Sequence, residues 1–184
     1  MKSASLTPIV KIELPKIKCL TLFFPKTGRL ILSGWSDDSL RIFSPNNGKL
    51  LKKISPANLG LPKVVIADDD SSKMFVGGNN GVIRIWNILE NKKFGLVEGA
   101  LAFHMKPVHD LAINPVKTEI MASCSEDGQI AIWNLNKFEL LNNFLVSNFL
   151  KGVTFLNVNI IRTWGAGNII YDCLISDGNI AKTL

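Results

Sequence analysis

One strand–turn–strand pattern recurs four times along the chain. In its most complete copy, apolar and polar residues alternate from Val108 to Trp133, with interruptions at Asn114-Pro115 and Asp127-Gly128. Such alternation, bounded by Gly, Pro, Asn and Asp, is typical of short antiparallel strands. The third strand of each copy ends at an equivalent position, which we place at Phe43, Trp86, Trp133 and, in a weaker copy, Asp172. A period of about 20–50 residues indicates a repeat architecture such as a β-propeller.

The repeats predict an all-β chain with about four blades in a single partial-propeller domain. The blades are expected over residues 17–61, 62–100, 101–147 and 148–184. Residues 1–16 are expected to hold a strand over Ile9–Leu14, ended by Pro15, as the outer strand of a preceding or closing blade. Unclosed propellers expose apolar blade faces. We therefore expect another chain or segment to complete a larger ring.

Composition narrows the class of protein. The hydrophobic share of 47% excludes disorder. No apolar run reaches the roughly 18–20 residues of a membrane helix, and the N-terminus lacks the pattern of a secretory signal. Cys19, Cys124 and Cys173 are odd in number and lie in strand patterns. We interpret them as buried free thiols in a reducing, intracellular compartment.

The net charge of +6 suits an acidic partner surface. However, the lysines are scattered, and no basic stripe is interleaved with stacking aromatic residues. The sequence therefore does not favour a nucleic-acid-binding protein.

The segment that ends Asp127-Gly128-Gln129 to Trp133-Asn134 resembles a WD40 repeat. The resemblance implies a structural hydrogen-bonded tetrad of His104, Ser123, Asp127 and Trp133. It also implies a ring that is usually seven-bladed. The other copies depart from the tetrad, because Phe43 follows Asp37, Asn80 precedes Trp86, and Gly167 occupies the acidic position of the last copy.

Two chemical alternatives use the same histidine. His104, Asp127 and Ser123 could form a catalytic set if they lay in an open cleft, but no Gly-x-Ser-x-Gly elbow accompanies them. His104 and His109 could bind a metal, but no cysteine or carboxylate cluster lies beside them. We expect no catalytic residue, no metal and no cofactor.

Partner contacts in WD40 proteins come mainly from one face, next to the turn carboxylate. By this resemblance, the candidate partner-face positions are Ser36, Asn79, Glu126 and Ala166. Trp35 and Trp164 are predicted at turn entrances on the same face. Because tryptophan is enriched at interface hot spots, both are candidate anchors, with rim packing as the alternative.

A closer resemblance lies in the phrases Ser33-Gly34-Trp35 to Phe43-Ser44, Val76-Gly77-Gly78 and Cys124-Ser125-Glu126-Asp127. In this order they are similar to the second propeller of the cilia- and flagella-associated protein 52 family. This resemblance implies a non-enzymatic structural component of axonemal doublet microtubules, in the lumen and in contact with tubulin. The chain departs from that family in having no first propeller. A generic cytoplasmic WD40 adaptor in a multiprotein complex is the alternative.

Overall fold

The computed structural model describes residues 10–89, 94–167, 169–175 and 180–183. These residues form four antiparallel four-stranded sheets and contain no helix, so the all-β prediction is confirmed. Sheet A contains β1 (Cys19–Phe23), β2 (Ile31–Trp35), β3 (Ser39–Phe43) and β4 (Leu50–Ile54). Sheet B contains β5 (Pro62–Ala67), β6 (Lys73–Gly78), β7 (Val82–Asn87) and β8 (Val97–Ala102).

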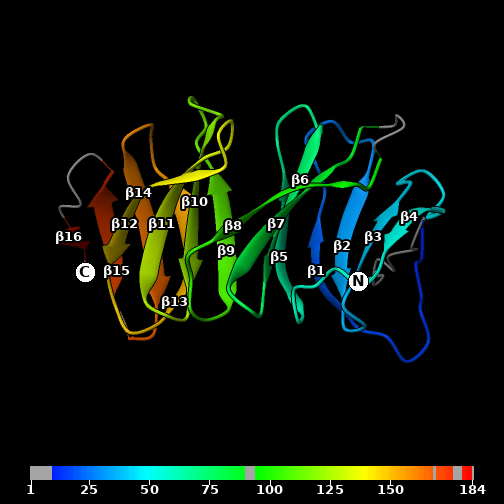
Figure 1. Ribbon diagram of the computed structural model, residues 1–184, viewed down its shortest axis with the longest axis horizontal. Coiled ribbons are helices and arrows are strands. Elements are labelled where there is room, and N and C mark those ends of the chain that lie inside the picture. The colour runs from blue at the N-terminus through cyan, green and yellow to red at the C-terminus, as the bar shows by residue number, and fades with distance from the viewer. Residues whose placement is uncertain (1–9, 90–93, 168, 176–179, 184) are drawn as a thin grey trace, which may run out of the picture.

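The second half of the chain repeats this order. Sheet C contains β9 (Val108–Ile113), β10 (Ile120–Ser125), β11 (Gln129–Asn134) and β12 (Glu139–Leu145). Sheet D contains β13 (Leu150–Phe155), β14 (Ile160–Gly165), β15 (Ile170–Leu174) and β16 (Ile180–Thr183). The four sheets follow one another in chain order across the molecule (Figure 1).

Apolar side chains between consecutive sheets hold the blades together. The first strands β1, β5, β9 and β13 lie next to one another in that order. One core between sheets A and B contains Leu32, Ile42 and Trp86. A second contains Phe75, Ile85 and Trp133 between sheets B and C, and a third lies between sheets C and D. Each sheet alternates side chains between its two faces and can therefore contribute to two cores.

Two sequence expectations, the strand before the first sheet and the burial of Cys19, are wrong. The strand expected over Ile9–Leu14 does not form, because residues 10–14 pair with no strand, and position 9 lies outside the described residues. Instead, Val10 and Ile12 lie close to Gly48, so apolar contact takes the place of a strand ladder. Cys19 is exposed on β1, whereas Cys124 and Cys173 are buried free thiols.

Candidate functional site: a buried tetrad and a turn face

The tetrad of sheet C is a continuous hydrogen-bonded chain. The Trp133 indole N–H donates to the Ser123 hydroxyl over 2.8 Å. Ser123 Oγ lies 2.7 Å from His104 Nε2, and His104 Nδ1 lies 3.1 Å from the nearer Asp127 oxygen. A neutral His104 that donates from Nδ1 and accepts at Nε2 satisfies every member, with the Ser123 O–H donating to the ring.

The electrostatics of the tetrad follow from its burial. The His104 side chain is fully buried, and burial lowers its pKa in opposition to the Asp127 charge, which raises it. Asp127 also accepts the backbone N–H groups of Met105 and Gln129, which tie its turn to the preceding loop. Ser123 is completely buried. His104 and Ser123 are therefore closed off from solvent, and their polar atoms are satisfied within the tetrad.

One backbone hydrogen bond recurs in all four sheets and identifies equivalent positions in them. In each sheet, the backbone N–H of the residue directly after the second strand donates to the carbonyl of the residue directly before the first strand. The donors are Ser36, Asn79, Glu126 and Ala166, and the acceptors are Lys18, Leu61, Pro107 and Phe149. The four candidate partner positions are therefore structurally equivalent. They follow the second strand of each sheet and so lie at the same end of the four sheets.

The Ser123 and Trp133 positions can then be followed through the sheets. Trp133 pairs with Met121, and the residues in the same register are Phe43, Trp86 and Cys173. Our placement of Asp172 in this position is therefore wrong by one residue. Because neighbouring strand residues point to opposite faces, Asp172 faces away from sheet C.

Sheet A has replaced the tetrad with another network. The Phe43 side chain has no hydrogen-bond donor, and the Trp35 indole N–H instead donates to the Ser33 hydroxyl over 2.8 Å. The Arg41 guanidinium lies 5.1 Å from the Trp35 ring centroid and forms two hydrogen bonds with the Asp37 carboxylate. These bonds hold the pKa of Asp37 well below its usual range. Sequence reasoning missed Arg41, although its position next to Asp37 on the same hairpin was a usable signal.

The two candidate tryptophan anchors lie in strands, not at turn entrances, and they differ. Trp35 ends β2 and is only 5% exposed, so it is a core residue of its blade. Trp164 lies within β14 and is 41% exposed. A Cβ atom at Gly152 would lie 2.0 Å from Trp164 Cζ2, so the ring covers β13.

Trp164 occupies a position that elsewhere faces the next sheet. Trp164 lies two residues before Ala166, the donor of the recurring backbone hydrogen bond. The residues two before the equivalent donors are Gly34, Gly77 and Cys124. A Cβ atom at Gly34 would meet Pro62 of β5, one at Gly77 would meet Val108 of β9, and Cys124 belongs to the core between sheets C and D. Trp164 therefore lies on the face of sheet D that points away from sheet C.

The same face of sheet D is partly polar. Arg162 and Asp172 form a bidentate ion pair with bonds of 2.7 and 2.8 Å, where sheets A and B have the apolar pairs Leu32–Ile42 and Phe75–Ile85. Ile170 beside them is 41% exposed. We name this surface, made of Trp164, Ile170, Arg162 and Asp172, the outward face of sheet D.

The partner-face positions carry modest chemistry. Ser36 and Asn79 are exposed, and the Ser36 hydroxyl accepts the Lys18 N–H. Glu126 is partly buried and lies 2.7 Å from His109 Nε2. Within the described residues, no group of three or more His, Cys, Asp or Glu side chains is arranged to hold a metal ion. In the same residues, no helix is long and apolar enough to cross a bilayer.

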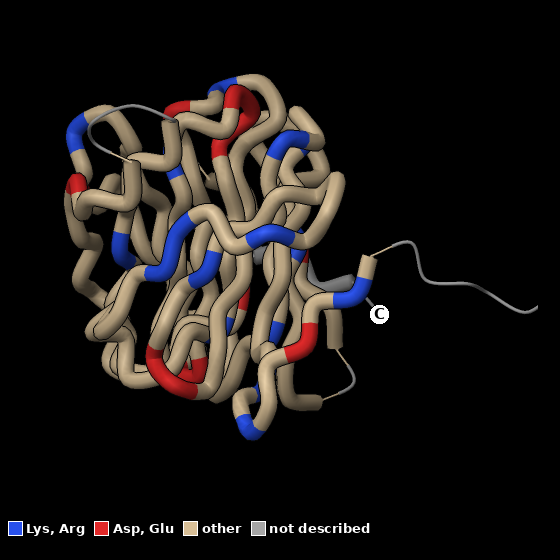
Figure 2. Tube along the Cα trace, turned by 90° about the vertical axis from the view of Figure 1, so that its right-hand side faces the viewer, with Lys and Arg blue, Asp and Glu red and all other residues tan. Residues whose placement is uncertain are grey.

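The basic residues do not form one stripe on the side of the molecule next to sheet A. Figure 2 shows Lys and Arg positions distributed across this side, among acidic ones. Lys53 lies 3.5 Å from Asp37, and Lys26 lies 2.7 Å from Asp69, so part of the positive charge is already paired.

Comparisons with known proteins agree with this geometry. The family described as "WD domain, G-beta repeat" matches residues 98–134, which include the tetrad. Cilia- and flagella-associated protein 52 from Chlamydomonas reinhardtii is 30% identical over 147 residues, which are 80% of this chain and 23% of that protein. The Mus musculus protein of the same name is 27% identical over 96% of this chain and 28% of its own length. The chain thus spans about a quarter of these relatives.

Solved structures show the same fold. The structure titled "Structure of U3-55K" superimposes with a TM-score of 0.80 at 17% identity, covering 92% of this chain and 53% of that one. "Crystal structure of RRP9 WD40 repeats" gives the same TM-score at 18% identity. The chain is a WD40-repeat protein related to cilia- and flagella-associated protein 52, and its sheets are propeller blades.

Proposed function

We propose that this WD40-repeat chain is a non-enzymatic scaffold of the ciliary or flagellar axoneme, located inside doublet microtubules in contact with tubulin. The observation that carries the proposal is the relationship to cilia- and flagella-associated protein 52, which extends through all four sheets at 27% identity in the mouse protein. The name of that relative places it in cilia and flagella. The location in the microtubule lumen is what the sequence resemblance to the cilia- and flagella-associated protein 52 family implies.

The state of the reactive side chains supports a scaffold. Ser123 and His104 are buried and satisfied by each other and by Trp133 and Asp127. Cys124 and Cys173 are buried, and burial raises the pKa of both thiols, so neither is a ready nucleophile. In the structure, the polar groups of the tetrad are engaged in holding strands together.

The partner contacts are proposed at the turn face. Ser36, Asn79, Glu126 and Ala166 project from equivalent turns on one side of four adjacent blades, so one partner surface can touch several of them at once. The net charge of +6 favours an acidic partner such as the tubulin surface.

A second contact of the scaffold is the completion of the ring. The outward face of sheet D corresponds in register to faces that pack against the next blade in sheets A, B and C. We infer that a further blade or another chain covers it, with Trp164 as the central apolar contact. The partner must also meet the Arg162–Asp172 pair with polar groups, because a purely apolar cover would bury that pair without further hydrogen bonds.

The test is fractionation of axonemes from ciliated cells that carry a tagged copy of the chain. A luminal component should remain with doublets through a high-salt wash that strips proteins from the outer surface, and it should be released when the doublets are dissolved. Recovery in the soluble cytoplasmic fraction would overturn the proposal.

The alternative is a cytoplasmic adaptor in another multiprotein complex. It is supported by similarity to "WD repeat-containing protein 55" from Mus musculus, which is 25% identical over 67% of this chain and 31% of that protein. The same fractionation separates the two functions, because an adaptor of this kind would leave the axoneme with the first wash.

A further inference from the structure

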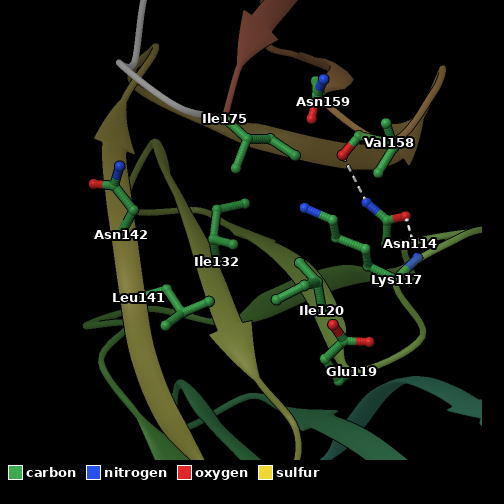
Figure 3. Close-up of a pocket in the computed structure, with 10 residues that line it drawn as sticks. All are labelled: Asn114, Lys117, Glu119, Ile120, Ile132, Leu141, Asn142, Val158, Asn159 and Ile175. Atoms are coloured by element: carbon green, nitrogen blue, oxygen red, sulfur yellow. Dashed lines mark hydrogen bonds between the residues drawn. The ribbon is translucent and has the colours of Figure 1, made fainter.

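A groove with a volume of about 440 Å³ opens between sheets C and D. Its walls come from the turn after β9, the outer strands of sheet C and the residues next to β14 and β15. Figure 3 shows Ile120, Ile132, Leu141 and Ile175 around one space, with Lys117 and Asn142 also lining it. The volume is in the range of sites that bind small ligands or single side chains of a partner.

The apolar part of the groove is built by a β-bulge. Ile132 of β11 pairs with Asn142, and Trp133 pairs with Leu140, so Leu141 is the extra residue of β12. A bulge redirects a side chain, and Leu141 lines the groove while it remains 47% exposed. Ile132 is 1% exposed and is already covered by its neighbours. An aliphatic side chain placed against Leu141 would remove apolar surface of that residue from water.

One cation extends into this space. Figure 3 shows the Lys117 amine directed toward the middle of the groove, whereas the Glu119 carboxylate lies at its lower rim. The Asn114 side chain accepts the Lys117 backbone N–H over 2.9 Å and donates to the Val158 carbonyl of the facing loop, so the turn is held in place. In the described part of the chain, Lys117 has no ion-pair partner. A carboxylate is the group that complements it.

The strand beside the groove can accept an extended segment. β12 is the outer strand of sheet C, so one of its edges is free of partners among the described strands. The corresponding strand β4 carries Lys52 and Lys53, and β8 carries Glu98, whereas the charge of β12 is confined to its first residue, Glu139, and residues 140–145 are uncharged. Charges on edge strands oppose the addition of another strand. After Glu139, β12 therefore offers six consecutive uncharged residues along which an extended segment could add.

We propose that the groove and the free edge of β12 bind an extended segment of a partner protein. The segment runs along β12, inserts a Leu, Ile or Val side chain between Leu141 and Ile175, and places an Asp or Glu carboxylate on Lys117. This site is separate from the turn face and from the outward face of sheet D. It does not depend on the axonemal assignment.

The test uses amide chemical shifts of the full chain during titration with a capped peptide, Gly-Asp-Val-Leu-Gly. We expect shifts at Lys117, Asn142 and Ile175, and much smaller ones with Gly-Asp-Ser-Ser-Gly, which lacks the aliphatic side chains. Lys117→Glu should weaken binding of the acidic peptide at least tenfold and favour Gly-Lys-Val-Leu-Gly instead.

The matched control is Lys49→Glu, an equal charge change on an exposed turn of sheet A, which should leave peptide affinity unchanged. A general charge effect would weaken both variants alike and would overturn the proposal. So would the absence of shifts around the groove, or an unchanged affinity in Lys117→Glu. A reversed preference for the lysine peptide is an outcome that damage to the fold would not produce.

Discussion

Trp86 and Trp133 occupy the same register in neighbouring sheets, opposite Met74 and Met121, but only the Trp133 indole N–H is hydrogen-bonded. Among the described side chains, the Trp86 indole nitrogen is the buried polar atom without a partner. The cause is the residue equivalent to Ser123, which in sheet B is Val76 and has no hydroxyl to accept the indole N–H. Leaving a buried donor unpaired costs about 1–3 kcal/mol.

This difference predicts a favourable interaction between Val76→Thr and Trp86. The new hydroxyl can accept the indole N–H and donate to the Arg84 carbonyl, as the Ser33 hydroxyl does to Arg41. We expect Val76→Thr to be about 1 kcal/mol more favourable with Trp86 present than in a Trp86→Phe background. A double-mutant cycle of urea unfolding measures this. Equal effects in both backgrounds would show that no bond forms.

His104 predicts a loss of stability in mild acid. Its pKa is lowered by burial, so the unfolded chain binds a proton more readily, and stability falls as the pH drops below about 6.5, the usual value for histidine. Protonation would also place an N–H against the Ser123 hydroxyl that now donates to Nε2. Urea unfolding at several pH values between 7.5 and 5.5 should show this slope, of at most about 1.4 kcal/mol per pH unit. His104→Gln should remove it. A slope that survives this substitution would contradict the assignment.

Asp37→Asn should destabilise sheet A by about 2 kcal/mol, because it leaves the buried Arg41 guanidinium without its counter-charge. The lowered pKa of Asp37 means that its contribution is present above pH 4 and is lost only in stronger acid. The matched control is Asp69→Asn, which breaks an exposed pair with Lys26. That change should cost less than about 1 kcal/mol in thermal or urea unfolding. Equal costs would show that burial of Arg41 is unimportant.

Trp164→Ser combined with Ile170→Ser should reduce self-association of the isolated chain. Both side chains are exposed on the outward face of sheet D, and uncovered apolar surface promotes association. Light scattering at several concentrations should give a lower average mass for the double variant. Val116→Ser, at an exposed turn away from this face, should have no effect. A monodisperse monomer of the unmodified chain would show that the four blades need no cover.

Sequence periodicity predicted the sheets well because each blade is determined locally. The alternation around Gln129–Trp133 and the Asp127-Gly128 turn identify a hairpin without knowledge of any distant contact. The candidate partner positions were also found at equivalent places, since they can be counted from each turn. The register of the weakest copy was not accessible in this way. Asp172 and Cys173 are adjacent, and only the pairing of Cys173 with Ile161 shows which of them is equivalent to Trp133.

The direction of the tryptophan side chains needed the structure as well. Trp35 and Trp164 occur near the ends of equivalent strands, but they differ by one position relative to the turn and so point to opposite faces. Trp35 points to the face on which the Ser33 hydroxyl can accept its indole N–H. Phe43, in the position of Trp133, has no side-chain donor to compete for that hydroxyl. The groove at Lys117 also depends on two sheets meeting, which no single repeat encodes.

The three apolar cores have a consequence for how the chain opens. Every substantial inter-sheet contact among the described residues joins consecutive sheets, so sheets B and C are supported from both sides and sheets A and D from one. Stability in such an array is approximately a sum over neighbouring units. Fraying should therefore begin at the two ends, with amides of β7 and β10 exchanging with deuterium more slowly than those of β3 and β15. A cavity made in the core between sheets C and D should accelerate exchange in β15 and leave β3 almost unchanged.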